Sequence, residues 1–296
     1  MKNLLHDRKI WAKPGKKHHV SDFDTEYTAD FIKKNDALDK LDKNLEEMIQ
    51  MQDKLYADSR YSLLLVFQAM DAAGKDGTIK HVMSGVNPQG TQVFSFKTPT
   101  ATELDHDYLW RIYKRLPERG NIGIFNRSHY EEVLVVKVHP EFLLRQQLPD
   151  AKNLNSINDN FWMQRYHQIN NFEKHLSENG TVILKFFLNV SKEEQKKRFL
   201  KRIDDPARNW KFSANDVKER SFWNAYMQAY SEMLTHTSTD YAPWFVIPAD
   251  NKWFMRYAVS NIIINRLKEL NLEYPTLPPA EMAGLEQARQ MLMEEK

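Results

Sequence analysis

The sequence predicts an α/β fold in which helices cover both faces of a parallel sheet, a three-layer α/β/α arrangement. Apolar segments of strand length recur along the chain, and helical patterns separate most of them. Hairpin turns are largely absent between these segments, which favours parallel pairing. The predicted sheet is five-stranded, with strands at Ser62–Phe67, Gln92–Phe96, Asn121–Phe125, Thr181–Leu188 and Trp244–Ile247.

The composition limits the class of protein. The 296 residues are 42% hydrophobic, which suits one large domain or two smaller ones. A net charge of +2 does not indicate a nucleic-acid-binding protein. The absence of cysteine excludes disulfides, thiolate metal sites and thiol catalysis. No apolar run approaches the ~20 residues of a membrane span and no signal peptide is evident, so we expect a cytoplasmic protein without membrane contacts.

The chain is predicted to have three parts. Residues 1–57 form an extended arm, up to about residue 34, and then an amphipathic helix from Asn35 to about Ala57. A core over 58–272 holds the predicted strands and a lid at about 192–225, and a C-terminal tail follows at 273–296. The apolar residues that recur at helical spacing in the first helix are Leu38, Leu41, Leu45, Met48 and Leu55.

A small-residue loop with Gly74 and Lys75 follows the first strand and precedes a helical pattern. This order is typical of a loop whose backbone N–H groups cradle phosphate at a helix N-terminus. The loop departs from the strict pattern G-x-x-x-x-G-K-[ST] at Ala69 and at Asp76. The alternative is an ordinary strand-to-helix turn with a solvated lysine. The predicted phosphate-binding residues are Ala72, Ala73, Gly74, Lys75, Asp76, Gly77, Thr78 and Lys80.

Asp71 is an acid inside this phosphate loop. A carboxylate beside a polyanion is repulsive unless a cation lies between them, and Mg²⁺ favours carboxylate and phosphate oxygens together. We therefore predict that Asp71 binds a metal ion. Asp76 either supports that metal or is a helix N-terminal acid that interacts with the helix dipole.

A cluster of basic residues precedes the third strand. Arg111 and Arg115 have the i, i+4 spacing that places both on one helix face. The pair either forms part of a solvated surface or lines a groove for a long polyanion.

The third predicted strand ends in polar residues, at the edge of the sheet where ligands bind in parallel α/β folds. Asn126 occupies the position where an acid normally orients Mg²⁺ in phosphate-loop enzymes. Arg127 can clamp phosphate, and Glu131 can supply the missing negative charge. The alternative is a polar turn with an incidental arginine.

The second half of the chain predicts further helices. One runs from Ser156 to Ser177 with Gly180 as its stop, and Ser191-x-x-Glu194 reads as a capping box that opens another. A closing helix is expected from Asp250 to Leu270. The charged helical tail from Glu281 to Lys296 either packs on a neighbouring subunit or is solvated.

The segment between Lys192 and Arg220 contains ten basic and six acidic residues. It predicts two helices joined by a basic loop, the arrangement of a lid that closes over phosphates and excludes water. The alternative is a solvated charged face. The candidate lid cations are Arg198, Arg202, Arg208 and Lys211.

Three motifs together resemble those of the family-2 polyphosphate kinases. They are Phe67–Thr78 around the phosphate loop, Phe125–Glu131 after the third strand, and Asn209–Ser213 in the lid. The resemblance extends from about Asp22 to about Leu272, and Asp76 and Asn126 are similar to the class III subgroup. It implies a P-loop kinase fold like that of thymidylate kinase, and a phosphotransferase that uses inorganic polyphosphate to convert AMP to ADP and ATP. It also implies Mg²⁺ or Mn²⁺ and a homodimer or homotetramer.

The resemblance implies roles for particular residues. The catalytic set is Asp71, Lys75, Asn126, Arg127 and Glu131, with Asp71 and Glu131 as the candidate metal ligands. Two other functions stay open on the sequence alone. One is an ATP-dependent nucleoside monophosphate kinase with the same loop and lid, and the other is a non-catalytic module that binds polyphosphate or nucleotides.

Overall fold

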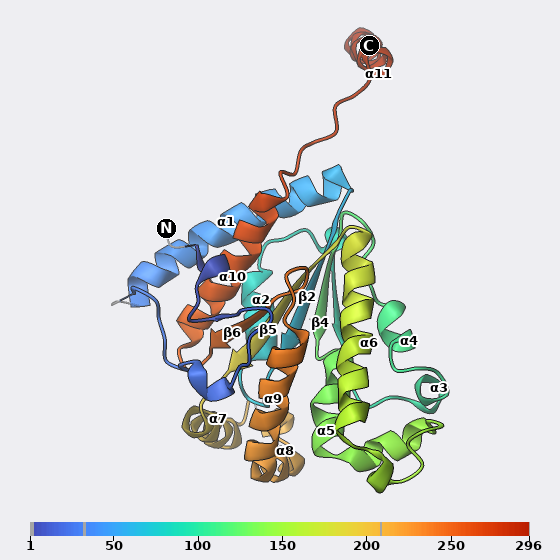
Figure 1. Cartoon of the computed structure of the whole chain (residues 1–296). Helices are drawn as coiled ribbons and strands as arrows, with labels where there is room; N and C mark the ends of the chain where they lie inside the picture. Colours follow the sequence, from blue (N-terminus) through green and yellow to red (C-terminus); the bar gives the residue numbers. More distant parts are fainter. Residues whose placement is uncertain (1–2, 32–33, 208, 296) are drawn as a thin grey trace.

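The computed structural model describes residues 3–31, 34–207 and 209–295. Its sheet lies between two layers of helices (Figure 1), as the sequence predicts. The strand order is β1-β6-β5-β2-β4-β3, and every neighbouring pair is parallel except β1 with β6. The strands are β1 (Trp11–Ala12), β2 (Ser62–Gln68), β3 (Thr91–Ser95), β4 (Ile122–Asn126), β5 (Thr181–Asn189) and β6 (Trp244–Pro248).

The prediction of five strands was wrong by one, because the N-terminal arm supplies β1. Trp11 lies opposite Phe245 and Ala12 opposite Trp244, in antiparallel register. The arm packs on the core through buried apolar side chains, among them Leu4 and Ile10. A two-residue strand is too short to give an alternating pattern, so sequence periodicity does not detect it.

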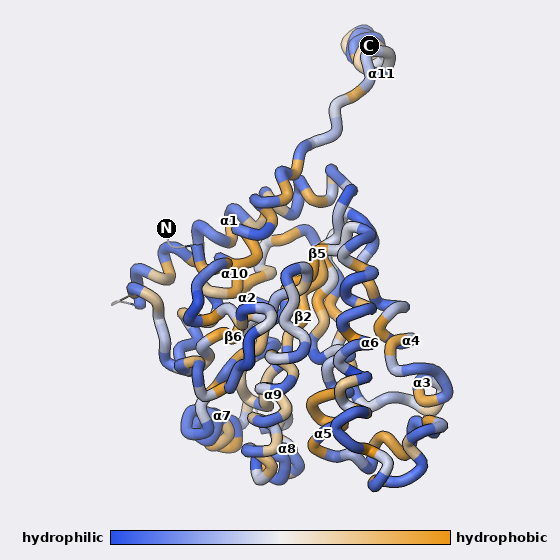
Figure 2. The backbone as a smooth tube through the Cα atoms, in the orientation of Figure 1, coloured by the Kyte–Doolittle hydropathy of each residue, from blue (hydrophilic) through white to orange (hydrophobic). Residues whose placement is uncertain are grey.

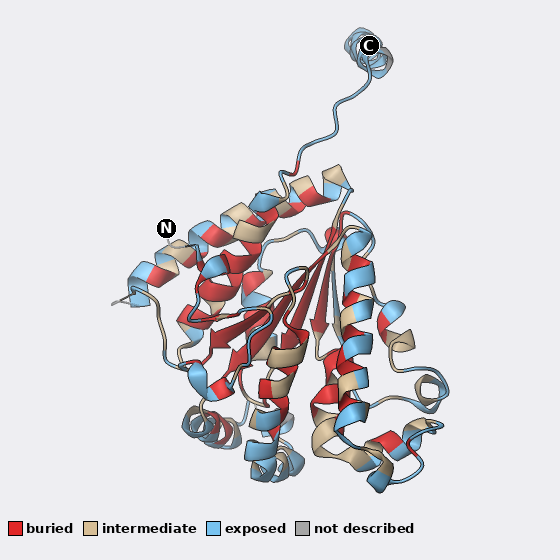
Figure 3. Cartoon of the chain, viewed as in Figure 1, coloured by how far each residue is buried: buried red, intermediate tan, exposed pale blue. Residues whose placement is uncertain are grey.

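The central strands are buried on both faces, which is why they read as continuous apolar runs. Every residue of β2 and β6 is buried, and so is β5 except for its first residue, Thr181. Figure 2 shows hydrophobic stretches along β2 and β5, and Figure 3 shows the same strands as the buried centre of the molecule. Lys185 is the one charged residue in these three strands, and it is fully buried.

Helices from distant parts of the chain form the two outer layers. The helix α1 (Lys34–Asp58) packs along α10 (Lys252–Glu269), which also contacts α2 (Lys75–Val82). The other layer contains α5 (Val135–Val138), α6 (Asp159–Glu178) and α9 (Trp223–Thr237) (Figure 1). The helix α9 contacts both of the others, and Lys137 of α5 donates to the Tyr166 hydroxyl of α6. The remaining α-helices are α3 (Ala101–Leu104), α4 (Trp110–Tyr113), α7 (Lys192–Asp204), α8 (Ala214–Glu219) and α11 (Pro279–Glu294).

Local chemistry sets the helix ends near the site. Asn158 begins α6 by accepting a hydrogen bond from the Phe161 amide, and Gly180, at φ +89°, follows its end. At the start of α7, the predicted reciprocal capping box is only half formed. The Ser191 hydroxyl accepts from the Glu194 amide, but the Glu194 carboxylate pairs with Arg198 instead of turning back to Ser191.

The C-terminal helix α11 projects away from the body at the end of an extended segment, residues 272–278 (Figure 1). It exposes large apolar side chains, including Met282, Leu285 and Leu292. That this tail packs on a neighbouring subunit stays a prediction. Among the described helices, none combines the length and apolar character needed to cross a bilayer.

Candidate active site

The parallel register brings the two predicted motifs together. Phe67 on β2 pairs with Asn126 on β4, so the chain leaves both strands at the same edge of the sheet. The Arg127 amide donates to the Phe67 carbonyl oxygen over 3.1 Å, which fixes the second motif beside the phosphate loop. The site therefore lies beyond the carboxyl ends of the strands, as expected for a parallel sheet.

The phosphate loop turns sharply into α2. Ala72 and Gly74 both have positive φ, +60° and +111°, and Gly74 caps the helix. A Cβ atom on Gly74 would lie 3.2 Å from Met255 Cε, so backbone conformation and packing both favour glycine there. The first amides of α2 have no partner within the helix, and they supply donors for an anion at this end.

A large open cavity lies over this loop, with a volume of about 1140 Å³. Cations dominate its ionisable lining, which matches a polyanionic ligand. The basic lining residues are Lys75, Lys97, Arg127, Arg198, Lys201, Arg202 and Lys252, and the acidic ones are Asp71, Asp76 and Asp216.

Lys75 is half-buried at the start of α2, and its Nζ donates to the Ala69 carbonyl oxygen over 2.9 Å. Burial lowers the pKa of this amine, while the nearby Asp71 carboxylate raises it. Not all of the predicted loop residues line the cavity. Thr78 is buried and donates to the Gly74 carbonyl oxygen, and Lys80 is exposed on α2 outside the lining.

Arg127 links the two motifs electrostatically. One of its guanidinium nitrogens lies 3.0 Å from Asp71 Oδ1, and the other lies 3.8 Å from Glu131 Oε2. Glu131 and Asp71 together raise the pKa of Arg127. Its backbone adopts φ +64°, a conformation that costs energy for a residue with a side chain. The surroundings must therefore hold this arginine in place.

Asn126 and Asp76, the two residues that resemble class III markers, contact each other. Asn126 Nδ2 donates to Asp76 Oδ1 over 2.8 Å. An aspartate at position 126 would place two carboxylates at this distance, so the neutral amide and the acid suit each other. Sequence spacing does not reveal this pairing, because 50 positions separate the two residues.

Glu131 pairs with Arg127 through the guanidinium nitrogen that does not contact Asp71, and it lines the second, smaller cavity described below instead of the large one. Burial raises the pKa of its carboxyl group, and the charges of Arg127 and Lys75 lower it. The amide of Gln68, with its nitrogen toward Glu131 Oε1, donates there over 2.8 Å and accepts from the Ser128 hydroxyl over 3.0 Å. Glu131 is therefore linked to both Arg127 and the phosphate-loop strand β2.

A second, smaller cavity of about 170 Å³ meets the first at Arg127. Its walls are largely apolar, and polar residues including Glu132 and Gln146 also line it. Lys97 and Thr98 border both cavities. The apolar side chains that line the small cavity are Phe96, Pro99, Leu104, Tyr108, Ile112, Val135, Val136 and Phe142.

Arg111 and Arg115 do not form the shared helix face expected from their spacing. The helix α4 ends at Tyr113, before Arg115. Arg111 lines the small cavity, where it donates to the Lys97 carbonyl oxygen over 2.9 Å, whereas Arg115 lies over the Phe94 ring and lines neither cavity.

Comparison with known proteins agrees with this geometry. A family model described as "Polyphosphate kinase 2 (PPK2)" matches residues 31–275. The chain belongs to the polyphosphate kinase 2 family. It is 53% identical to an "ADP-polyphosphate phosphotransferase" of Rhodopseudomonas palustris, over 84% of this chain and 85% of the relative. It is 42% identical to an "AMP/ADP-polyphosphate phosphotransferase" of Meiothermus ruber, over 90% and 95%.

The fold agrees as well. The crystal structure of polyphosphate kinase 2 from Arthrobacter aurescens matches with a TM-score of 0.82 at 38% identity. The match covers 94% of this chain and 98% of that one. The mostly parallel α/β core is therefore that of a polyphosphate kinase 2.

Sequence reasoning missed two cations that line the large cavity, Lys97 and Lys252, and it placed Lys201 on the basic lid helix without selecting it as a lid cation. Lys97 follows the carboxyl end of β3, and Lys252 follows that of β6. The rule that ligands bind beyond the carboxyl ends of parallel strands predicts both positions if it is applied to every strand. Asp216, an acid in the predicted lid, also lines the cavity, and burial raises its pKa.

The segment predicted to be a lid, at about 192–225, contains α7, the 3₁₀ turn Asn209–Lys211 and α8. A guanidinium nitrogen of Arg202 on α7 lies 3.8 Å from Asp216 Oδ2 on α8. Both residues line the large cavity. Arg208 lies outside the described residues, as does the side chain of Lys211.

Arg198 is not a free lid cation. It is only 9% exposed and pairs with Glu194 over 2.8 Å. Its guanidinium also donates to the carbonyl oxygens of Ala73 and Ala249, at 2.6 and 2.5 Å. Longer bonds reach the carbonyls of Ala72 and Asp250. Arg198 therefore fastens the phosphate loop to the end of β6.

Because Arg198 is buried and Arg202 is more exposed, replacing them should affect the stability of the fold to different extents. Arg198→Ala is expected to lower the free energy of unfolding by about 3 kcal/mol, because buried carbonyls lose a charged donor. Arg202→Ala, on the same helix, removes a more exposed side chain and is expected to change it by less than about 0.5 kcal/mol. Urea unfolding of both variants measures the difference, and equal losses would contradict the assigned role of Arg198.

Proposed function

We propose that this kinase, as a class III member of its family, moves the terminal phosphoryl group of inorganic polyphosphate to AMP and to ADP. The products are ADP and ATP, and the reaction is reversible. The observation that carries the proposal is the meeting of two unlike cavities at Arg127, one basic and open, the other small and apolar. The relatives named as AMP/ADP- and ADP-polyphosphate phosphotransferases support this choice of substrates.

The basic cavity suits the donor. Polyphosphate carries a negative charge on each unit, and the cavity extends from the phosphate loop to Lys201 and Arg202 of α7 and to Lys252 of α10. The terminal phosphoryl group would lie against the first amides of α2 and Lys75, where the helix dipole also favours an anion.

The small cavity suits the nucleoside of the acceptor. Aromatic and aliphatic walls bury a planar base, and a few polar groups orient it. Arg127 lines both cavities, so a nucleoside held here would have its phosphate beside Arg127 and close to the phosphate loop.

The residues present fit a divalent metal ion at Asp71. Its side chain is 32% exposed and lines the basic cavity together with Asp76. Mg²⁺ is typically held by one or two protein carboxylates and takes its other ligands from phosphate and water. Consistent with that, the described residues include no cluster of three or more metal-binding side chains. We assign Asp71 to Mg²⁺ or Mn²⁺, and Glu131 to the support of Arg127; the bound metal would neutralise phosphate charge.

The transfer itself requires little covalent chemistry. An anionic oxygen of the acceptor phosphate forms a bond to the terminal phosphorus of polyphosphate. The bond from that phosphorus to the bridging oxygen breaks, and the shortened chain leaves with the electron pair. Lys75 and Arg127 position the reacting groups and offset the negative charge that develops on the phosphoryl oxygens.

Exchanging the donor tests this function. The protein is incubated with Mg²⁺ and AMP or ADP, with either long-chain polyphosphate or ATP as donor, and the nucleotides are separated by chromatography. We expect ADP and ATP to form with polyphosphate. Transfer from ATP to AMP in the absence of transfer from polyphosphate would indicate a nucleoside monophosphate kinase. Binding without turnover would indicate a non-catalytic module.

A further inference from the structure

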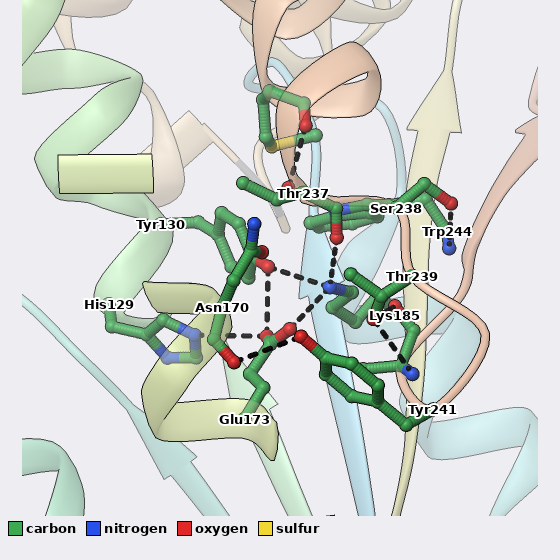
Figure 4. Close-up of polar contacts among 12 residues, drawn as sticks. His129, Tyr130, Asn170, Glu173, Lys185, Thr237, Ser238, Thr239, Tyr241 and Trp244 are labelled. Carbon is green, nitrogen blue, oxygen red and sulfur yellow. Dashed lines mark hydrogen bonds and ion pairs between the residues drawn. The ribbon is translucent and has the colours of Figure 1, made fainter. Parts of the chain in front are cut away.

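Lys185, Glu173 and Tyr130 form a buried polar network that lines neither cavity; it also includes His129, which lines the small cavity (Figure 4). Its centre is Lys185, in the middle of β5, with no exposed surface. Lys185 Nζ lies 2.5 Å from Glu173 Oε2, 2.7 Å from the Tyr130 hydroxyl and 2.8 Å from the Thr237 carbonyl oxygen. All three protons of the ammonium group therefore have acceptors.

The carboxylate of Glu173 is equally well satisfied. Its Oε1 accepts from the Tyr130 hydroxyl over 2.8 Å and lies 3.2 Å from His129 Nε2. Burial alone raises the pKa of Glu173, but Lys185 and His129 overcome this effect and hold the pKa below its usual value. Burial lowers the pKa of Lys185 to about 8, so the pair is charged near neutral pH.

Stability alone does not account for such a pair. Two charges lose their hydration when they are buried, and apolar residues of similar volume are often at least as stabilising. The residues that contact the pair indicate another role, because two of them adjoin the Arg127 segment. His129 and Tyr130 come directly after Arg127 and Ser128, and they begin the 3₁₀ helix His129–Val133 that carries Glu131.

The segment from Arg127 to Glu131 is thus held from two sides. On one side, the Gln68 amide lies between Ser128 and Glu131. On the other side, the network ties Tyr130 to β5, to α6 through Glu173, and to the last residue of α9, Thr237. These contacts provide the surroundings that the positive φ of Arg127 requires.

We infer that the Lys185–Glu173–Tyr130 network positions Arg127 for phosphoryl transfer. The inference rests on the proposed function, in which Arg127 contacts the transferred group. None of the three network residues lines either cavity, so they act through Arg127 and do not touch the substrate.

A double-mutant cycle tests the inference. Tyr130→Phe removes one buried hydroxyl and keeps the ring, and it is combined with Arg127→Ala. We expect Tyr130→Phe to lower kcat about tenfold and to weaken binding of tripolyphosphate about threefold in the wild-type background. Both effects should disappear in the Arg127→Ala background, whereas the loss of thermal stability should persist there.

Tyr166→Phe is the matched control. Tyr166 is also buried, and its hydroxyl contacts Glu232, but it has no hydrogen bond to the 127–131 segment. It should lower the melting temperature without changing kcat. Equal kcat losses from Tyr130→Phe in both backgrounds would overturn the inference.

Two further outcomes are covered. If Tyr130→Phe does not fold, the neutral pair Lys185→Met with Glu173→Gln replaces it in the same cycle, with the same expectations. If the wild type binds tripolyphosphate but shows no turnover, the proposed function fails. The same four proteins can then be compared by their dissociation constants for tripolyphosphate, and this double-mutant cycle still decides whether the network acts through Arg127.

Discussion

Replacing Lys75 by methionine is expected to lower kcat by about a thousandfold while the protein stays folded. The ammonium group lies at the start of α2, within electrostatic reach of Asp71 and Arg127, where the proposed function places the transferred phosphoryl group. Loss of one well-placed charge in such a site typically costs two to three orders of magnitude. Methionine replaces the unbranched four-atom stem of lysine and lacks only the terminal ammonium group, so the packing of the stem is kept. Turnover of AMP with polyphosphate, followed by chromatography, measures the loss.

The same variant is expected to retain its stability. Within the described residues, the Lys75 ammonium group donates to the Ala69 carbonyl oxygen alone, a bond whose loss costs about 1 kcal/mol. Lys80→Met is the control on the same helix, because Lys80 is exposed and lies outside the cavity lining. A Lys75→Met variant with near wild-type kcat would refute the assigned role of the lysine.

Asp71→Asn is expected to lower kcat by about a hundredfold and to raise the Mg²⁺ concentration needed for half-maximal activity. The amide keeps the size of the side chain but is a poorer ligand for a hard cation. It also loses the ion pair that Asp71 makes with Arg127 over 3.0 Å. Activity measured against a series of Mg²⁺ concentrations, at saturating polyphosphate, separates the metal effect from the loss of rate.

Asp76→Asn is the comparison for this experiment. Asp76 lines the same cavity, but its carboxylate accepts a hydrogen bond from Asn126, whereas that of Asp71 pairs with Arg127. A smaller shift in the Mg²⁺ requirement is expected for Asp76→Asn than for Asp71→Asn. The reverse order would assign the principal metal contact to Asp76.

Much of the core could be predicted from the sequence, because strands buried on both faces of a parallel sheet read as apolar runs. The proximity of Lys75, Asp71 and Arg127 also followed, since the carboxyl ends of parallel strands meet at one edge. The strand β1 could not be predicted, because a strand of two residues has no periodic pattern of apolar side chains.

Hydrogen bonds of individual buried side chains to residues distant in the sequence were not predictable. Helical spacing pairs Arg198 with Arg202, but it does not show that four backbone carbonyls face only the first of them. Likewise, a lysine within the apolar run of β5 gives no indication that Glu173 and Tyr130 will satisfy it. Such polar contacts depend on which surfaces the finished fold brings together.

The short strand β1 has a consequence for how the protein can be trimmed. An open sheet exposes unpaired backbone groups along its outermost strands, which invites pairing with other molecules and aggregation. Here the arm covers that side of β6, and the Val246 amide donates to the Ile10 carbonyl oxygen over 2.7 Å. Deleting the first dozen residues would spare every residue of the catalytic cleft and yet leave β6 open to self-association. We therefore expect the arm to keep this edge of the sheet from pairing with other molecules.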